Sequence, residues 1–244
     1  MRPDPGRVAV VTGGNGGIGR AITNRLLADG MRVVSLDRLF GEGCDERATR
    51  ILTDLTDEAQ VRSCFADIEQ QLGPIEILVN NAGFYQVPRR PFWELDVDEW
   101  DLLLRSNIQP VFLCSRAVSS GMRERRHGGI VNIASGVVAI GMAGAMHYVA
   151  AKAAVVGMTR CMARELGPFD VTVNAIAPGL VPTPASQSSI PAEAFEYALG
   201  AQCIRRNVST EQVADAVGYF CSSAAATITG QTLLIDGGAA FSGL

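Results

Sequence analysis

The sequence has few of the features that mark membrane or secreted proteins. Its longest apolar stretches are interrupted by glycine, threonine, asparagine or a charged residue, well before the ~20 residues that cross a bilayer. We therefore expect no transmembrane helix and no membrane partner. Met1 to Asp4 lead almost directly into a strand-like run, so we also expect no secretory signal.

Metal and disulfide chemistry have equally little support. The chain has two histidines, and its six cysteines are far apart, without a C-x-x-C pair. Such spacing indicates reduced thiols in a cytoplasmic protein and predicts no metal site. The cysteines are Cys44, Cys64, Cys114, Cys161, Cys203 and Cys221.

A strong positive field is also missing, because the net charge is -4 and the basic residues are scattered. The densest basic cluster consists of Arg123, Arg125 and Arg126, and we interpret it as the solvated end of a helix. No nucleic-acid partner is expected.

The sequence does contain a regular alternation of short β-branched runs and longer amphipathic stretches, which predicts βαβ units and a parallel sheet. With no linker-like break, residues 1–244 are predicted to form one α/β domain, a Rossmann-like doubly wound parallel sheet of about seven strands with helices on both faces. Residues 178–206 are the one long stretch expected to be irregular, and we interpret about 180–206 as a substrate lid. Strands are expected at 7–12, 32–36, 49–52, 75–80, 130–135, 171–176 and 231–235, and helices at 18–29, 57–72, 98–126, 146–166 and 210–222.

A glycine-rich turn follows the first expected strand and opens the first helix. Backbone amides in such a turn can face a pyrophosphate at the positive end of the helix. Asp37 ends the second expected strand, where a carboxylate can bind both ribose hydroxyls of the adenosine and repel a 2′-phosphate. The sequence therefore predicts NAD rather than NADP, although Arg38 could partly accommodate the phosphate. The turn residues assigned to the cofactor are Gly13, Asn15, Gly16, Gly17, Ile18 and Gly19.

With Thr12 the turn reads T-G-x-x-x-G-x-G, and an N-N-A-G element begins at Asn80. The sequence resembles the short-chain dehydrogenase/reductase family in these motifs, and the similarity continues in family order to Asp236-Gly237-Gly238. The resemblance implies further cofactor contacts after the third, fourth and sixth strands. These are Asp54, Leu55, Asn81, Ala82, Gly83, Pro178, Gly179, Val181 and Thr183.

Tyr148 and Lys152 are four residues apart in an expected helix, so they share one face. A nearby ammonium and the positive nicotinamide both favour the phenolate of Tyr148, which can then act as acid/base in alcohol oxidation or ketone reduction. The resemblance implies that Lys152 also binds the nicotinamide ribose, that Ser135 holds the substrate oxygen, and that Asn107 holds a water of the proton relay. His147 is interpreted as a satisfied structural residue rather than a second acid.

The substrate is expected to be a small alcohol or ketone in a mainly apolar pocket. Its predicted lining includes Ser135, Val137, Tyr85, Trp93 and Met142. Two other functions stay open: a 3-oxoacyl-[acyl-carrier-protein] reductase, which the resemblance implies, and a dinucleotide-binding regulator without turnover. The family also implies a homotetramer or homodimer, with residues 98–126 and 146–166 across one interface.

Overall fold

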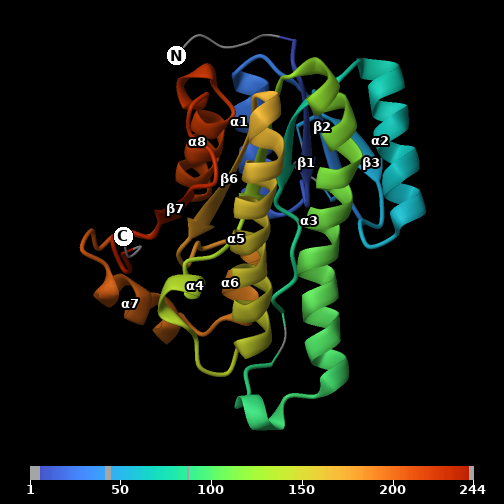
Figure 1. Cartoon of the computed structure of the whole chain (residues 1–244). Helices are drawn as coiled ribbons and strands as arrows, with labels where there is room; N and C mark the ends of the chain where they lie inside the picture. Colours follow the sequence, from blue (N-terminus) through green and yellow to red (C-terminus); the bar gives the residue numbers. More distant parts are fainter. Residues whose placement is uncertain (1–5, 42–44, 87, 242–244) are drawn as a thin grey trace.

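The protein is described here from a computed structural model that covers residues 6–41, 45–86 and 88–241. Its centre is a seven-stranded sheet in the order β3-β2-β1-β4-β5-β6-β7 (Figure 1), and all six strand pairs are parallel. The strand order reverses between β1 and β4, as in a doubly wound fold. The predicted fold class is confirmed. The strands are β1 (Val8–Thr12), β2 (Arg32–Asp37), β3 (Thr49–Leu52), β4 (Ile75–Asn80), β5 (Gly128–Ile133), β6 (Val171–Pro178) and β7 (Thr232–Ile235).

Helices cover both faces of the sheet, which explains why most positions of the central strands are apolar. In β1, Val8 and Val10 belong to a core cluster with α2, α3 and α5, whereas Ala9 and Val11 belong to a cluster with α1 and α8. Alternate side chains of a strand point to opposite faces, so both faces must be apolar when both are covered. The covering helices are α1 (Gly17–Ala28), α2 (Glu58–Leu72), α3 (Val97–Arg125), α5 (Met146–Leu166) and α8 (Thr210–Phe220).

The segment 178–206 is not irregular, and this expectation is wrong. It contains two helices, α6 (Pro184–Ser189) and α7 (Ala192–Ala201). Thr183 and Ser186 form a reciprocal capping box at the start of α6, which satisfies amides that the first helical turn leaves free. In Figure 1, α6, α7 and the short α4 (Val137–Ile140) lie past the carboxyl end of β6, where ligands bind in this class of fold.

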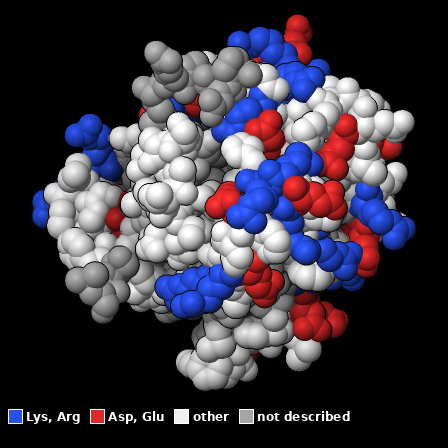
Figure 2. Space-filling model, turned by 45° about the horizontal axis from the view of Figure 1, so that its top comes forward, with Lys and Arg blue, Asp and Glu red and all other residues white. Residues whose placement is uncertain are grey.

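The structure also bears on membrane spans, metal sites and surface charge. Among the described residues, no helix is long and apolar enough to cross a membrane, and no group of three His, Cys, Asp or Glu residues could hold a metal ion. Charged side chains of both signs are intermingled on the face shown in Figure 2. Cys44 and Met1 to Asp4 lie outside the described residues.

Candidate active site

The glycine-rich turn between β1 and α1 requires glycine at several positions. Gly13 has φ +65°, and a Cβ there would lie 2.8 Å from the Cα of Ala82. A Cβ on Gly14 would overlap the Ser35 hydroxyl, and one on Gly19 would overlap the carbonyl oxygen of Gly13. The close approach of backbones therefore explains the motif physically.

The turn fits the pyrophosphate of a dinucleotide. The N-cap of α1 is Gly16, which has no side chain to bind the free amides of the first turn, so these amides are available to an anion. A Cβ on Gly17 would lie 2.8 Å from Cγ2 of Thr183. The predicted cofactor residues Gly17 and Thr183 thus lie so close together that a side chain at 17 would clash with Thr183.

Asp37, at the end of β2, lies beside the glycine-rich turn. The Asp37 carboxylate accepts the amide of Asn15 at 3.0 Å and that of Arg38 at 2.7 Å. The Arg38 guanidinium pairs with Asp54 at 2.9 Å. Hydrogen bonds from Thr56 and Arg38 lower the pKa of Asp54 to about 2.

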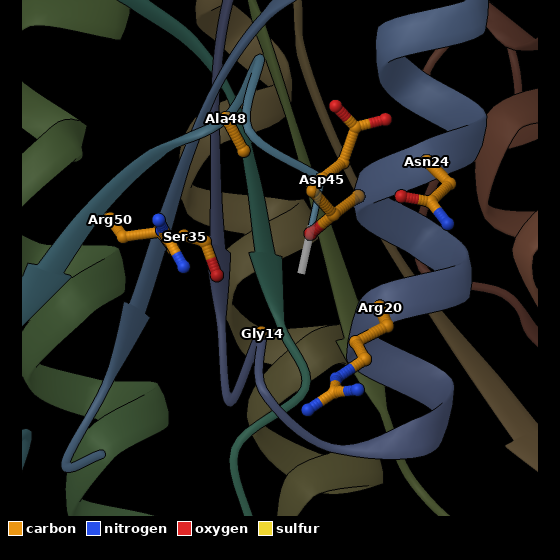
Figure 3. Close-up of a pocket in the computed structure, with 8 residues that line it drawn as sticks. Gly14, Arg20, Asn24, Ser35, Asp45, Ala48 and Arg50 are labelled. Carbon is orange, nitrogen blue, oxygen red and sulfur yellow. The ribbon is translucent and has the colours of Figure 1, made fainter. Parts of the chain in front are cut away.

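A small hollow lies beside the glycine-rich turn, between α1 and strands β2 and β3 (Figure 3). Arg20, Asn24 and Asp45 are among the residues that line it. None of the four predicted catalytic residues does, so the hollow is separate from the site of chemistry.

The N-N-A-G element joins the ends of β1 and β4. The Thr12 hydroxyl accepts the amides of Asn81 and Ala82, both at 3.0 Å, and Asn81 Nδ2 donates to the carbonyl oxygens of Thr12 and Gly13. The side chain of Asn81 therefore holds the turn, and only the neighbouring backbone faces the cleft. Asn80 is buried and donates to Ser115 and Asn132.

Three of the predicted catalytic side chains lie together at the carboxyl end of β5. The Ser135 hydroxyl lies near that of Tyr148, and its hydrogen-bonding effect lowers the pKa of the phenol, while Lys152 Nζ lies 5.9 Å from the centroid of the Tyr148 ring. Lys152 is 5% exposed, and its Nζ donates to the carbonyl oxygen of Ile133 at 3.0 Å. The arrangement places a phenol, a hydroxyl and an amine around one point.

The electrostatics of this group differ from the expectation. Burial raises the pKa of Tyr148 to about 12, against a smaller opposing effect of the hydrogen bond with Ser135. Burial also lowers the pKa of Lys152 to about 8. Desolvation thus favours the neutral phenol, and the hydrogen-bonding effect of Ser135 offsets only part of it. The effect of Lys152 and of a bound nicotinamide on the phenolate stays a prediction.

Lys152 also stands out in the composition of the sequence. It is the only lysine in the 244 residues, and the other 20 basic residues are arginine. Arginine serves equally well for most surface charges, but it is larger and cannot be deprotonated in proteins. A single retained lysine indicates that this position needs a compact amine.

Asn107 on α3 holds the loop after the N-N-A-G element. Its carboxamide accepts the amide of Phe84 at 3.2 Å and donates to the carbonyl oxygens of Phe84 and Leu103 at 2.8 and 2.9 Å. A Cβ on Gly83 would lie 2.8 Å from Oδ1 of Asn107 and 3.1 Å from Nζ of Lys152. Gly83 therefore lies directly against two of the predicted catalytic residues.

The predicted substrate residues divide into two groups. Tyr85 lies at the site, with its ring 6.3 Å from that of Tyr148, edge to face, and its hydroxyl near those of Thr183 and Ser189. Val137, in α4, and Met142, in the loop before α5, are partly buried. Trp93 is 72% exposed on the short helix η1 (Phe92–Glu94), edge-on to Phe92. Such exposure gives no support to its predicted role in a pocket wall.

The side chains of Leu55, Val181 and Ile18, three other predicted cofactor residues, pack in the core. Leu55 and Val181 are 6% and 5% exposed and belong to the two core clusters. Ile18 packs against the cluster of α1 and α8. Pro178 pairs with Ile235 at the end of β6, and Gly179 donates to Ile235.

His147 is fully buried and hydrogen-bonded through both ring nitrogens. This agrees with a satisfied residue, but its partners were not predicted. The Tyr148 amide donates to Nδ1, and Glu99 on α3 lies 3.1 Å from Nε2.

Known proteins resemble the chain over nearly its whole length. A family model described as Enoyl-(Acyl carrier protein) reductase matches residues 13–240. The 3-oxoacyl-[acyl-carrier-protein] reductase FabG of Vibrio harveyi is 35% identical over 96% of this chain and 97% of its own length. The cis-4-hydroxycyclohexanecarboxylate dehydrogenase of Sinomonas cyclohexanicum is 37% identical over 95% and 96%.

A solved structure gives the same result. A protein from Sinorhizobium meliloti 1021, assigned as a short-chain alcohol dehydrogenase, superimposes with a TM-score of 0.87 at 31% identity and covers 96% of both chains. These relatives are oxidoreductases, and the family binds a nicotinamide dinucleotide. Fold, motifs and relatives agree that the chain belongs to the short-chain dehydrogenase/reductase family.

Proposed function

We propose that this protein is an NAD(H)-dependent dehydrogenase that interconverts a secondary alcohol and a ketone, with Tyr148 as the acid/base. The observation that carries the proposal is the meeting of Ser135, Tyr148 and Lys152 at the carboxyl end of β5, with Tyr85 joining Tyr148 to the cofactor residue Thr183. The bound dinucleotide supplies the acceptor or donor of the hydride.

The residues of the site supply the proton and the orientation. In oxidation, Tyr148 Oη would take the hydroxyl proton while the carbinol C–H bond breaks and its hydrogen leaves as hydride. In reduction, the phenol would return the proton to the ketone oxygen. Ser135, whose hydroxyl lies near that of Tyr148, would bind the same substrate oxygen. Because burial raises the pKa of Tyr148 to about 12, the phenol is ready to donate at neutral pH, and oxidation should accelerate as the pH rises.

The Tyr148→Phe variant tests the acid/base role. We expect it to bind NADH with unchanged affinity and to lose at least about a hundredfold in kcat. A kcat near that of the wild type would refute the assignment. If the wild type binds NADH but turns over no alcohol or ketone in a broad panel, the alternative of a regulator without turnover is favoured.

The preference for NAD rests on the placement of Asp37 beside the glycine-rich turn. Two unit charges at ~4 Å repel by about 4 kcal/mol near a protein surface, and the Arg38 guanidinium that could offset this is already paired with Asp54. In titrations of both cofactors, Asp37→Ala should lower the preference for NADH over NADPH by about tenfold or more. The matched control is Asp170→Ala, an exposed aspartate directly before β6 that should leave the preference unchanged. Equal losses for both cofactors would contradict the assignment.

Two relatives of this protein are named for different substrates. FabG of Vibrio harveyi is named for a protein-bound acyl substrate, and the Sinomonas cyclohexanicum enzyme for a cyclic hydroxy acid. Carrier proteins are acidic, and Arg126, the basic residue best placed to hold one, is paired with Asp170 at 2.6 Å. Arg123 lies over the ring of Phe169. These contacts weaken the positive field there and support a small alcohol, which parallel assays of an acyl thioester and substituted cyclohexanols would test.

We further propose that the protein acts in the cytoplasm as a homotetramer or homodimer, through α3 and α5. Val111 and Val155, which could have lain in such an interface, belong to the core of the monomer. Phe112 on α3 is 49% exposed and Met146 on α5 is 44% exposed, so these two apolar side chains are available to an interface. Sedimentation of the wild type and of Phe112→Glu gives the test, since a monomeric wild type contradicts the proposal.

A further inference from the structure

Helix α5 begins without an ordinary cap, although it carries Tyr148 in its first turn. The N-cap residue is Ala145, whose side chain cannot accept a hydrogen bond. Tyr148 is the third residue of the helix, at the position whose amide an N-cap side chain would normally bind. Its amide donates instead to Nδ1 of His147, at 3.0 Å.

This contact fixes the tautomer of the neutral imidazole. Since Nδ1 accepts a hydrogen bond, the proton of the neutral ring must be on Nε2. Nε2 therefore donates to Oε1 of Glu99, 3.1 Å away in the first turn of α3. His147 is 1% exposed and Glu99 is 15% exposed by side chain, so water competes little for either group.

A loop beside the site is tied to the same pair. Arg90 lies 3.6 Å from Oε2 of Glu99, and its amide donates to the carbonyl oxygen of Gly144 at 3.2 Å. Gly144 lies in the short loop that leads into α5. Glu99 and His147 thus connect α3, the loop that follows Tyr85 and the first turn of α5.

We propose that His147, held by Glu99, is a positioning residue that sets the place of Tyr148. The imidazole binds the main chain of Tyr148, and the carboxylate prevents the ring from rotating. Loss of either contact should let the first turn of α5 shift, which moves the phenol relative to Ser135 and Lys152. A displacement of this kind slows chemistry without weakening cofactor binding. The inference rests on the proposed role of Tyr148 as acid/base.

Substitutions at 147 separate capping from packing. Asparagine places an acceptor near the position of Nδ1, whereas leucine fills a similar volume without one. We expect His147→Leu to lower kcat about ten- to a hundredfold with the Kd for NADH within about twofold of wild type, and His147→Asn to recover most of the loss. Equal losses in both variants, or a folded His147→Leu with wild-type kcat, would overturn the proposal.

Substitutions at 99 give an independent test if changes at the buried histidine prevent folding. Glu99→Gln retains an acceptor for Nε2 and should keep most of kcat, whereas Glu99→Leu should lose about tenfold or more. Asp98→Leu, an exposed neighbour in the same helical turn, is the matched control. Wild-type kcat in Glu99→Leu contradicts the proposal.

Two further measurements keep this inference distinct from the proposed function. Tyr148→Phe is assayed in parallel: if it stays active, the acid/base assignment fails, and if it is inactive while His147→Leu is unaffected, only the positioning role fails. Crystal structures of the wild type and His147→Leu need no turnover. We expect the Tyr148 hydroxyl to leave Ser135 in the variant, and an unmoved hydroxyl would overturn the inference.

Discussion

Gly83→Ala adds a single methyl group between two residues of the site. Gly83 is not among the glycines with positive φ, so its backbone conformation is open to alanine. The cost must come from contacts, because the new Cβ would lie 2.8 Å from Oδ1 of Asn107 and 3.1 Å from Nζ of Lys152. Neither atom can move freely, since Asn107 makes three hydrogen bonds and Lys152 is bonded to Ile133.

The size of the effect follows from these bonds. If the carboxamide of Asn107 rotates away, it loses its two bonds with Phe84, at about 1 kcal/mol each. About 2 kcal/mol corresponds to a fall in Tm of about 4–8 °C for a chain of this length. Displacement of the Lys152 ammonium should also lower kcat by about tenfold or more.

Thermal unfolding and steady-state kinetics of Gly83→Ala measure the two effects separately. Gly200→Ala is the matched control for stability, because this helical glycine of α7 has no neighbouring atoms within 4 Å of an added Cβ. Alanine should there raise stability, by up to about 1 kcal/mol. If Gly83→Ala has the Tm and kcat of the wild type, the packing of Gly83 against Asn107 and Lys152 has no consequence, and the reasoning is refuted.

Two further predictions concern buried polar groups. Burial lowers the pKa of Lys152 from 10.5 to about 8, so the unfolded chain binds more protons between about pH 8 and 10.5, and the free energy of unfolding should rise with pH across that window. Lys152→Met should remove this rise, increase stability at pH 7 and abolish activity. Thermal melts between pH 7 and 10.5 measure the effect, and an unchanged dependence of stability on pH in the variant would contradict the assignment. Asn132→Leu should cost about 2–3 kcal/mol in urea unfolding, because Asn80 and Thr159 both lose their bonds to it. Asn80→Leu combined with Asn132→Leu should cost clearly less than the sum of the single changes, and strict additivity would contradict the network.

The sheet and its main helices could be predicted because their signals are local. A strand covered on both faces is apolar at most positions, as β1 is from Val8 to Val11, and an amphipathic helix repeats its apolar residues every third or fourth position. Helices α6 and α7 were missed because Pro184, Pro191 and the neighbouring serines were interpreted as loop residues. Proline is also favoured at the start of a helix, and both prolines lie at such positions, Pro184 at the first residue of α6 and Pro191 at the N-cap of α7. The same residues thus predict a helix when their order is considered.

The proximity of Tyr148 and Lys152 could be predicted, but not their electrostatics. The four-residue spacing of Tyr148 and Lys152 follows from helix geometry alone. The pKa of each group depends on how completely the rest of the fold removes water from it, and no local pattern records that. Burial raises the pKa of Tyr148 and lowers that of Lys152, and the four-residue spacing predicts neither shift.

The pairing of His147 with Glu99 illustrates the limit of motif analysis most clearly. The two residues are 48 positions apart, on different helices, and neither lies in a motif that we used. A histidine beside a catalytic tyrosine has two local interpretations, a second acid or a packing residue. Only the crossing of α3 and α5 decides between them, because it gives the ring a carboxylate on one side and a main-chain amide on the other. A ring with both nitrogens occupied has no proton to exchange with a substrate, so any part it has in the chemistry must come from where it holds Tyr148.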